Sequence, residues 1–166
     1  MVLGDSFPSS LREAETEQRL VPGAVLYLEV TFPEDSNTKE KYLVIVATVE
    51  PDVLALVINT EVHPFVASKP EFARCQWVID KAGHPFLSYD SFLACHKTLS
   101  LPHAQVVGDL VSDMSRYRGE ISEQMRTQIC GVMMTQPKQI SKSIRDAIVA
   151  GLSTSGCADD GTDSVG

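Results

Sequence analysis

The sequence has no long hydrophobic run. Its longest apolar stretches, at residues 43–47 and 53–58, fall well short of the roughly 20 residues that a membrane-spanning helix needs. The first twenty residues carry several charges and contain no hydrophobic segment of the kind found in secretory signals. We therefore expect a cytoplasmic protein with no membrane partner.

Motifs for binding metals, phosphates and dinucleotides are also missing. The four cysteines include no C-x-x-C pair, which favours buried or surface thiols over zinc ligands. The glycine-rich phosphate and dinucleotide loops, the G-x-S-x-G nucleophile turn and the H-E-x-x-H motif are absent. The four histidines lack the spacing of metal sites, which favours surface or packing roles. We expect neither a cofactor nor a metal.

Positive charge is scarce. The 166 residues include 22 acidic and 14 basic side chains, and the net charge of −8 argues against avid, non-specific nucleic-acid binding. The two ends, residues 1–21 and 153–166, hold seven of the acids and two of the bases, which leaves −3 for the body between them. The net charge of the body alone therefore argues less strongly against nucleic-acid binding.

The two ends differ in character from the body. Ser10 to Glu13 form a possible capping box before a short helix, so we predict that residues 1–21 are a flexible N-terminal arm ending at Pro22-Gly23. Residues 153–166 are small, polar and acidic, which predicts a disordered tail. Residues 22–152 are expected to form a single domain.

The first part of this domain has the spacing of strands. Leu26, Leu28, Val30 and Phe32 alternate with more polar residues, and a polar loop at 33–41 follows. Two runs rich in β-branched residues around Glu50-Pro51-Asp52 predict a hairpin of central strands. The predicted strands cover residues 24–32, 42–49, 53–59, 76–79, 86–87 and 91–97.

After Pro102 the apolar spacing becomes helical. The predicted helix faces are Val107, Leu110, Val111 and Met114, then Met125, Ile129, Val132 and Met133 after Ser122, and finally Ile140, Ile144, Ala147, Ile148 and Leu152. Strands followed by helices indicate an α+β fold, in which a small curled sheet is capped by helices.

Two features leave a choice open. The loop at 33–41 is either a lid over a groove, with lysines for phosphate and carboxylates for proton transfer, or a solvated connection between strands. The methionines at 125, 133 and 134 either face a partner helix or belong to the core.

The order of these pieces resembles the MazF/PemK toxin family. A strand after Pro22-Gly23, the hairpin ending at Thr60, a strand at 77–79, the run Asp90 to Leu93 and a helix opening at Ser122 carry the resemblance, which covers residues 22–134. It implies a small antiparallel SH3-like β-barrel with C-terminal helices, usually a homodimer. The family consists of mRNA endoribonucleases whose active groove a cognate antitoxin tail covers.

The resemblance also implies a site. The family's catalytic pair is an arginine followed by proline at the start of the second strand, and a threonine or serine at the end of the third; here Lys41-Tyr42 and Thr60 match these positions. A lysine lacks the planar fork of a guanidinium. Losing one such donor typically costs ~3 kcal/mol, or about a hundredfold in rate. His63 is a candidate for the base that takes the 2′-hydroxyl proton.

Two functions follow from this pattern. The first is a toxin that cleaves single-stranded RNA without a metal, with Lys41 supplying charge to the phosphate and Thr60 positioning it. The second is a barrel that has lost the nuclease and binds a protein, either an antitoxin or a target like that of the gyrase-poisoning relatives. The acidic loop residues Glu34, Asp35 and Glu40, expected beside the phosphate, would oppose the first function.

Overall fold

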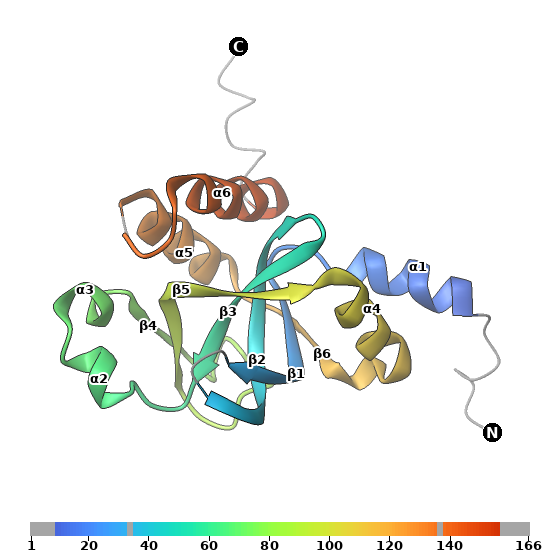
Figure 1. Cartoon of the computed structure of the whole chain (residues 1–166), viewed down its shortest axis with the longest axis horizontal. Coiled ribbons are helices and arrows are strands. Elements are labelled where there is room, and N and C mark those ends of the chain that lie inside the picture. The colour runs from blue at the N-terminus through green and yellow to red at the C-terminus, as the bar shows by residue number, and fades with distance from the viewer. Residues whose placement is uncertain (1–8, 33–34, 136–137, 157–166) are drawn as a thin grey trace, which may run out of the picture.

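Within residues 9–32, 35–135 and 138–156, which the computed structural model describes, one antiparallel sheet of six strands forms the centre of the fold (Figure 1). The strands are β1 (Ala24–Phe32), β2 (Asp35–Val49), β3 (Asp52–Asn59), β4 (Gln76–Ile79), β5 (Ser91–Pro102) and β6 (Tyr117–Glu120). Their order across the sheet is β4-β5-β3-β2-β1-β6. The predicted α+β class and the antiparallel sheet are confirmed.

The sheet is open. β4 and β6 lie at opposite ends of the strand order, and no pairing between them closes the sheet in the part of the chain described. The closed barrel implied by the resemblance is therefore not confirmed.

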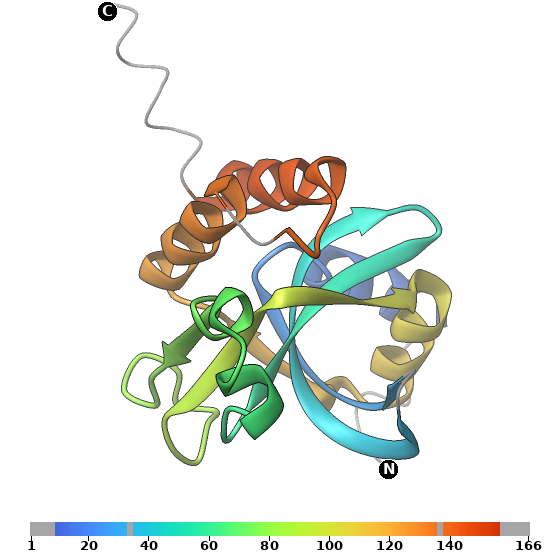
Figure 2. The same cartoon turned by 60° about the vertical axis from the view of Figure 1, so that its left-hand side comes forward.

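In the same described residues, six α-helices and one 3₁₀ turn surround the sheet. They are α1 (Ser9–Arg19), α2 (Pro64–Ala67), α3 (Pro70–Ala73), α4 (His103–Ser112), η2 (Met114–Arg116), α5 (Glu123–Thr135) and α6 (Lys142–Gly156). α5 and α6 pack together over one face of the sheet (Figure 2). α4 covers part of the other face, and α1 lies beside α4. We name these two faces of the sheet the α5 face and the α4 face.

Both faces are buried because successive side chains of a strand point to opposite sides. On β2, Val44 and Val46 join the core cluster of the α5 face, whereas Leu43 and Ile45 join that of the α4 face. A strand covered on both sides needs apolar residues at every position. This explains the unbroken apolar runs of the two central strands, which the sequence correctly assigns to a hairpin.

The predicted helix faces are largely confirmed. Met125 and Ile129 of α5 and Ile148 of α6 are fully or almost fully buried. In α4, however, the buried residues are Val106 and Leu110, and the predicted Val107 is only half-buried. Adjacent valines at 106 and 107 both fit a helical stripe with Leu110, so only packing against the sheet decides between them.

Three strand predictions need correction. β2 begins at Asp35, so most of the predicted loop at 33–41 is strand, because β1 offers a partner along its whole length. Phe86 and Leu87 lie outside any strand and serve as packing residues. β5 continues beyond residue 97 to Pro102, since Asp52 to Ala55 of β3 pair with it. The short elements α2, α3 and β6 were not expected.

The ends of the chain also contain regular structure. Residues 9–19 of the predicted arm form α1, where Thr16 is buried, and Leu20 joins the α4-face core. Residues 153–156 of the predicted tail continue α6, and residues 157–166 lie outside the described part. Among the described helices, none has the length and apolar character needed to cross a membrane.

A buried arginine ties α5 to the start of β1. Arg126 is 5% exposed, and its guanidinium donates to the carbonyls of Pro22 and Leu152 and to a carboxylate oxygen of Glu120. Gly23, with φ of +98°, lies directly against the guanidinium, and a Cβ there would collide with it. Gly23 and Arg126 therefore form one packed unit.

Candidate active site

The two central strands bring Lys41 and Asn59 together on the α4 face. Tyr42 pairs with Ile58, so Lys41 of β2 lies opposite Asn59 of β3. The Lys41 Nζ donates a hydrogen bond to the Asn59 Oδ1 over 3.1 Å, and both side chains are half-buried. Lys41 is well inside β2 rather than at its start, because β2 begins at Asp35 instead of the predicted residue 42.

The ammonium of Lys41 is partly removed from water. Burial, with a smaller contribution from the neighbouring charge of Lys39, lowers the pKa of Lys41 from its ordinary value of 10.5. A partly desolvated cation attracts an anion more strongly than a fully hydrated one does. Lys41 is therefore suited to hold a negatively charged group at this point of the sheet.

Thr60 directly follows Asn59, in a bend just after β3 ends. Its side chain is exposed, and its hydroxyl has no hydrogen-bond partner among the described residues. The fold therefore places an unengaged hydroxyl one residue from the amide that binds Lys41.

His63 lies further along the same connection and has a local structural role. Its Nδ1 accepts a hydrogen bond from the backbone N–H of Phe65 over 3.1 Å, which caps the short helix α2. In the neutral ring the proton is then on Nε2, so the ring acts as a donor there. No contact joins His63 to Lys41 or Thr60 in the part of the chain described.

The expected acidic surroundings of Lys41 are only partly present. Glu40 points to the α5 face, opposite to Lys41, and its carboxylate lies 3.9 Å from the guanidinium of Arg116. Its expected position beside an incoming phosphate is wrong, since neighbouring residues of a strand alternate in direction. Glu34 and the side chain of Asp35 lie outside what the structure describes.

An aromatic residue extends this surface across the sheet. Asn59 pairs with Phe92 of β5, and Phe92 pairs with Val78 of β4, so these side chains follow Lys41 in one row. Phe92 is half-buried and belongs to neither core cluster, and Val78 is 53% exposed. Strands are about 4.8 Å apart, which places the aromatic ring roughly 10 Å from the lysine position.

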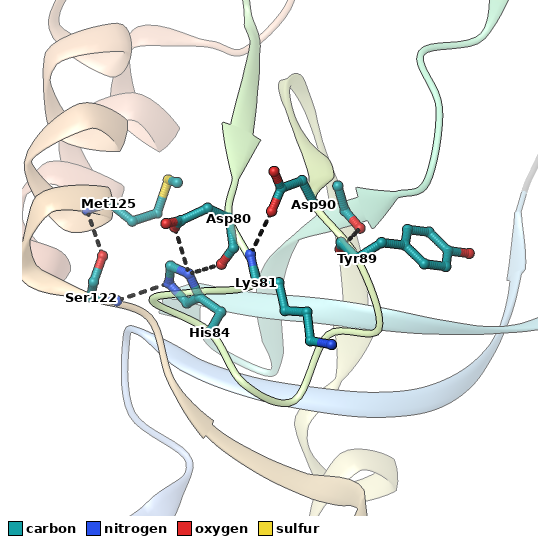
Figure 3. Close-up of polar contacts among 8 residues, drawn as sticks. Asp80, Lys81, His84, Tyr89, Asp90, Ser122 and Met125 are labelled. Atoms are coloured by element: carbon teal, nitrogen blue, oxygen red, sulfur yellow. Dashed lines mark hydrogen bonds and ion pairs between the residues drawn. The ribbon is translucent and has the colours of Figure 1, made fainter.

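The loop between β4 and β5 fixes the strand end that carries Phe92 (Figure 3). The backbone N–H of Lys81 donates to the Asp90 carboxylate over 2.8 Å, which closes the loop near its base. Buried His84 accepts the Ser122 N–H at Nε2, so its Nδ1 carries the proton and donates to the carbonyl of Asp80. The neutral ring thereby joins the loop to the start of α5, which is a structural role.

Sequence reasoning missed Asn59 and Phe92. Both follow from strand register, which sets Asn59 opposite Lys41 and Phe92 opposite Asn59. The available signal was the position of Asn59 directly before Thr60 in the predicted hairpin.

In comparisons with known proteins, no protein-family model and no curated protein sequence matches this chain.

Proposed function

We propose that the protein is a metal-independent endoribonuclease of the MazF/PemK type that cleaves single-stranded RNA. One observation carries the proposal: the half-buried ammonium of Lys41 is held by Asn59, one residue before the exposed hydroxyl of Thr60. We propose that the bend after Asn59 turns the Thr60 hydroxyl toward the face that carries Lys41. A cation and a hydroxyl on one face suit a phosphodiester, whose non-bridging oxygens gain negative charge during attack.

The reaction needs only groups that the RNA and these residues provide. The ribose 2′-oxygen attacks the adjacent phosphorus, the bond from phosphorus to the 5′-oxygen breaks, and the products are a 2′,3′-cyclic phosphate and a 5′-hydroxyl. Lys41 stabilises the charge on the phosphorane, and Thr60 donates a hydrogen bond to a non-bridging oxygen. A base accepts the 2′-hydroxyl proton, and the 5′-oxygen takes a proton from water. His63 serves as this base once its ring releases the cap on α2.

The row of side chains beside Lys41 favours a single strand over a duplex. Phe92 offers a ring on which an unpaired base can stack, and such stacking is worth about 1–3 kcal/mol per base. Bases within a duplex are already stacked on each other and cannot use such a ring.

The wider assignment rests on the same resemblance. We propose that the curved open sheet is a divergent form of the SH3-like barrel, and that the protein acts in the cytoplasm as a homodimeric toxin under the control of a cognate antitoxin. An antitoxin segment that covers Lys41 would protect the host's RNA.

A cleavage assay on a long unstructured RNA in EDTA tests the nuclease. Lys41→Ala and Thr60→Ala should each lower the rate about a hundredfold, as expected for the loss of a transition-state donor. Two exposed residues away from the row supply matched controls, Lys138→Ala and Thr127→Ala, which should cleave at the parent rate. All variants are purified identically, so a contaminating nuclease would give equal rates throughout. If Lys41→Ala and Thr60→Ala both cleaved RNA at the parent rate, the assignment of these two residues to the site would be wrong.

A second candidate is the barrel that binds a protein and does not cleave RNA. The specific observation in its favour is the lysine at position 41, where the family pattern has arginine. Absence of cleavage at every protein concentration, together with capture of a small acidic partner by the parent chain, would favour this function.

A further inference from the structure

Among the described residues, the backbone hydrogen-bonding groups on the outer edge of β4 have no partner. The N–H of Cys95 donates to the carbonyl of Cys75, so alternate residues from Cys75 onward share hydrogen bonds with β5. The N–H and C=O groups of Gln76 and Val78 consequently face away from β5, and β4 is the last strand of the sheet. An edge of this kind is a template for another strand.

A groove runs along this edge, between β4 and α5. One hollow of about 270 Å³ is lined by Arg74, Trp77 and Gly131, and a second of about 150 Å³ is lined by Val78 and Asp80. Gln128 of α5 lines both hollows, so they lie end to end. The Trp77 Nε1 is buried and has no hydrogen-bond partner among the described residues. The edge is therefore incompletely packed as well as incompletely hydrogen-bonded.

The charges along this groove are symmetric about Trp77. Arg74 lies three residues before Trp77, and Asp80 lies three residues after it. Both side chains are exposed and line opposite ends of the groove. When two copies of this segment run antiparallel with Trp77 opposite Trp77, each arginine meets the aspartate of the other copy.

We propose that a second copy of this chain pairs with β4 about a two-fold axis at Trp77. The same alignment sets Gln76 opposite Val78 of the other copy, and these are the residues whose backbone groups face outward. The register that matches the charges therefore also matches the hydrogen bonds. A two-fold contact of this kind is self-complementary, as closed dimers require.

The strand alone is too short for a stable dimer, which usually buries about 800 Å² on each partner. The groove provides the additional surface, because the partner's Trp77 lies beside its own counterpart and fills the hollow against α5. Gly131 supports a close approach, since a Cβ added there meets no atom within 4 Å. The pairing keeps the α4 faces of both copies on one side of a continuous sheet, so both Lys41 sites remain open on that side.

Charge reversal tests this interface, independently of any nuclease activity. The parent chain should be a dimer by analytical ultracentrifugation, while Arg74→Glu and Asp80→Lys should each be folded monomers, because each places like charges opposite one another. An equimolar mixture of these two monomeric variants should form a heterodimer, because both of its charge pairs are then opposite in sign. Lys142→Glu, at an exposed position in the first turn of α6, should remain dimeric.

A second variant separates the interface from the loop contact of Asp80 with His84, which spans 3.5 Å (Figure 3). Asp80→Asn loses the charge without reversing it, so it should weaken the dimer less than Asp80→Lys does. Trp77 is the only tryptophan, and its emission should shift to longer wavelength as the parent is diluted into monomers. A monomeric parent, a dimer that survives both reversals, or a mixture that stays monomeric would each overturn the proposal.

Discussion

A double-mutant cycle on Gly23 and Arg126 tests how α5 is attached to the sheet. Gly23→Ala places a methyl group where the Arg126 guanidinium lies, at a backbone φ of +98° that disfavours any side chain. Arg126→Met removes the guanidinium and keeps an apolar side chain of similar length. The two changes should be strongly coupled, because the first also removes the arginine from its site.

The magnitude follows from the contacts. The positive φ costs alanine roughly 1–2 kcal/mol. Hydrogen bonds to a charged donor contribute roughly 1.5–3 kcal/mol each. Of the Arg126 bonds, the one to Leu152 spans 3.4 Å and the ion pair with Glu120 is half-exposed, so we count mainly the bond to Pro22. Gly23→Ala should then lower the free energy of unfolding by about 4 kcal/mol and Arg126→Met by about 2–3 kcal/mol.

The double variant should lose about 4 kcal/mol rather than the sum of the two single losses, which is a coupling of about 2–3 kcal/mol. Urea titrations followed by Trp77 fluorescence measure these values. Gly119→Ala is the control, because Gly119 also has a positive φ, +118°, but no atom lies within 4 Å of an added Cβ. It should show the backbone cost alone. Additive losses for Gly23→Ala and Arg126→Met would refute the account of one packed unit.

Four further predictions concern three residues. Lys41→Arg should raise the rate of RNA cleavage about tenfold or more by restoring a planar fork, and an unchanged rate would contradict the role of Lys41. Burial and the charge of Lys39 lower the pKa of Lys41, so the cleavage rate of the parent should decline at a lower alkaline pH than the ordinary lysine pKa of 10.5 would give. Lys41→Arg should move this decline to higher pH. Burial, with a smaller contribution from the charge of Lys97, lowers the pKa of His96 below its ordinary value of 6.5. The unfolded chain therefore binds a proton at this histidine more readily than the folded chain does, so the free energy of unfolding should decrease as the pH falls through 6.5. Urea titrations at several pH values measure this dependence, and His96→Phe should make it weaker. Gly108→Ala in α4 should raise the free energy of unfolding by about 0.5–1 kcal/mol, because the helix gains a better helix former in open space; a loss in the same titration would contradict this.

The parts of the fold that the sequence predicts well are those fixed by periodicity. β1 and β4 have the predicted bounds, because alternation and flanking turn residues specify a strand locally. The faces of α5 and α6 are also correct, since each has a clear apolar stripe. The first half of β2 was missed for the opposite reason: residues 35–41 are polar, and only pairing with β1 makes them a strand.

The candidate site shows the same division between local and long-range information. Lys41 and Thr60 were accessible through a sequence pattern, whereas Asn59 and Phe92 depend on the register of three strands. Register is set by bulges, and β3 has a shift against β2 between Ile45 and Ala47 that no local motif announces. If the register is not known, the residue opposite Lys41 cannot be predicted, and Lys41 then looks like any surface lysine. The burial of the Lys41 ammonium, on which the proposed chemistry depends, is thus a consequence of sheet assembly rather than of the residues next to it in the chain.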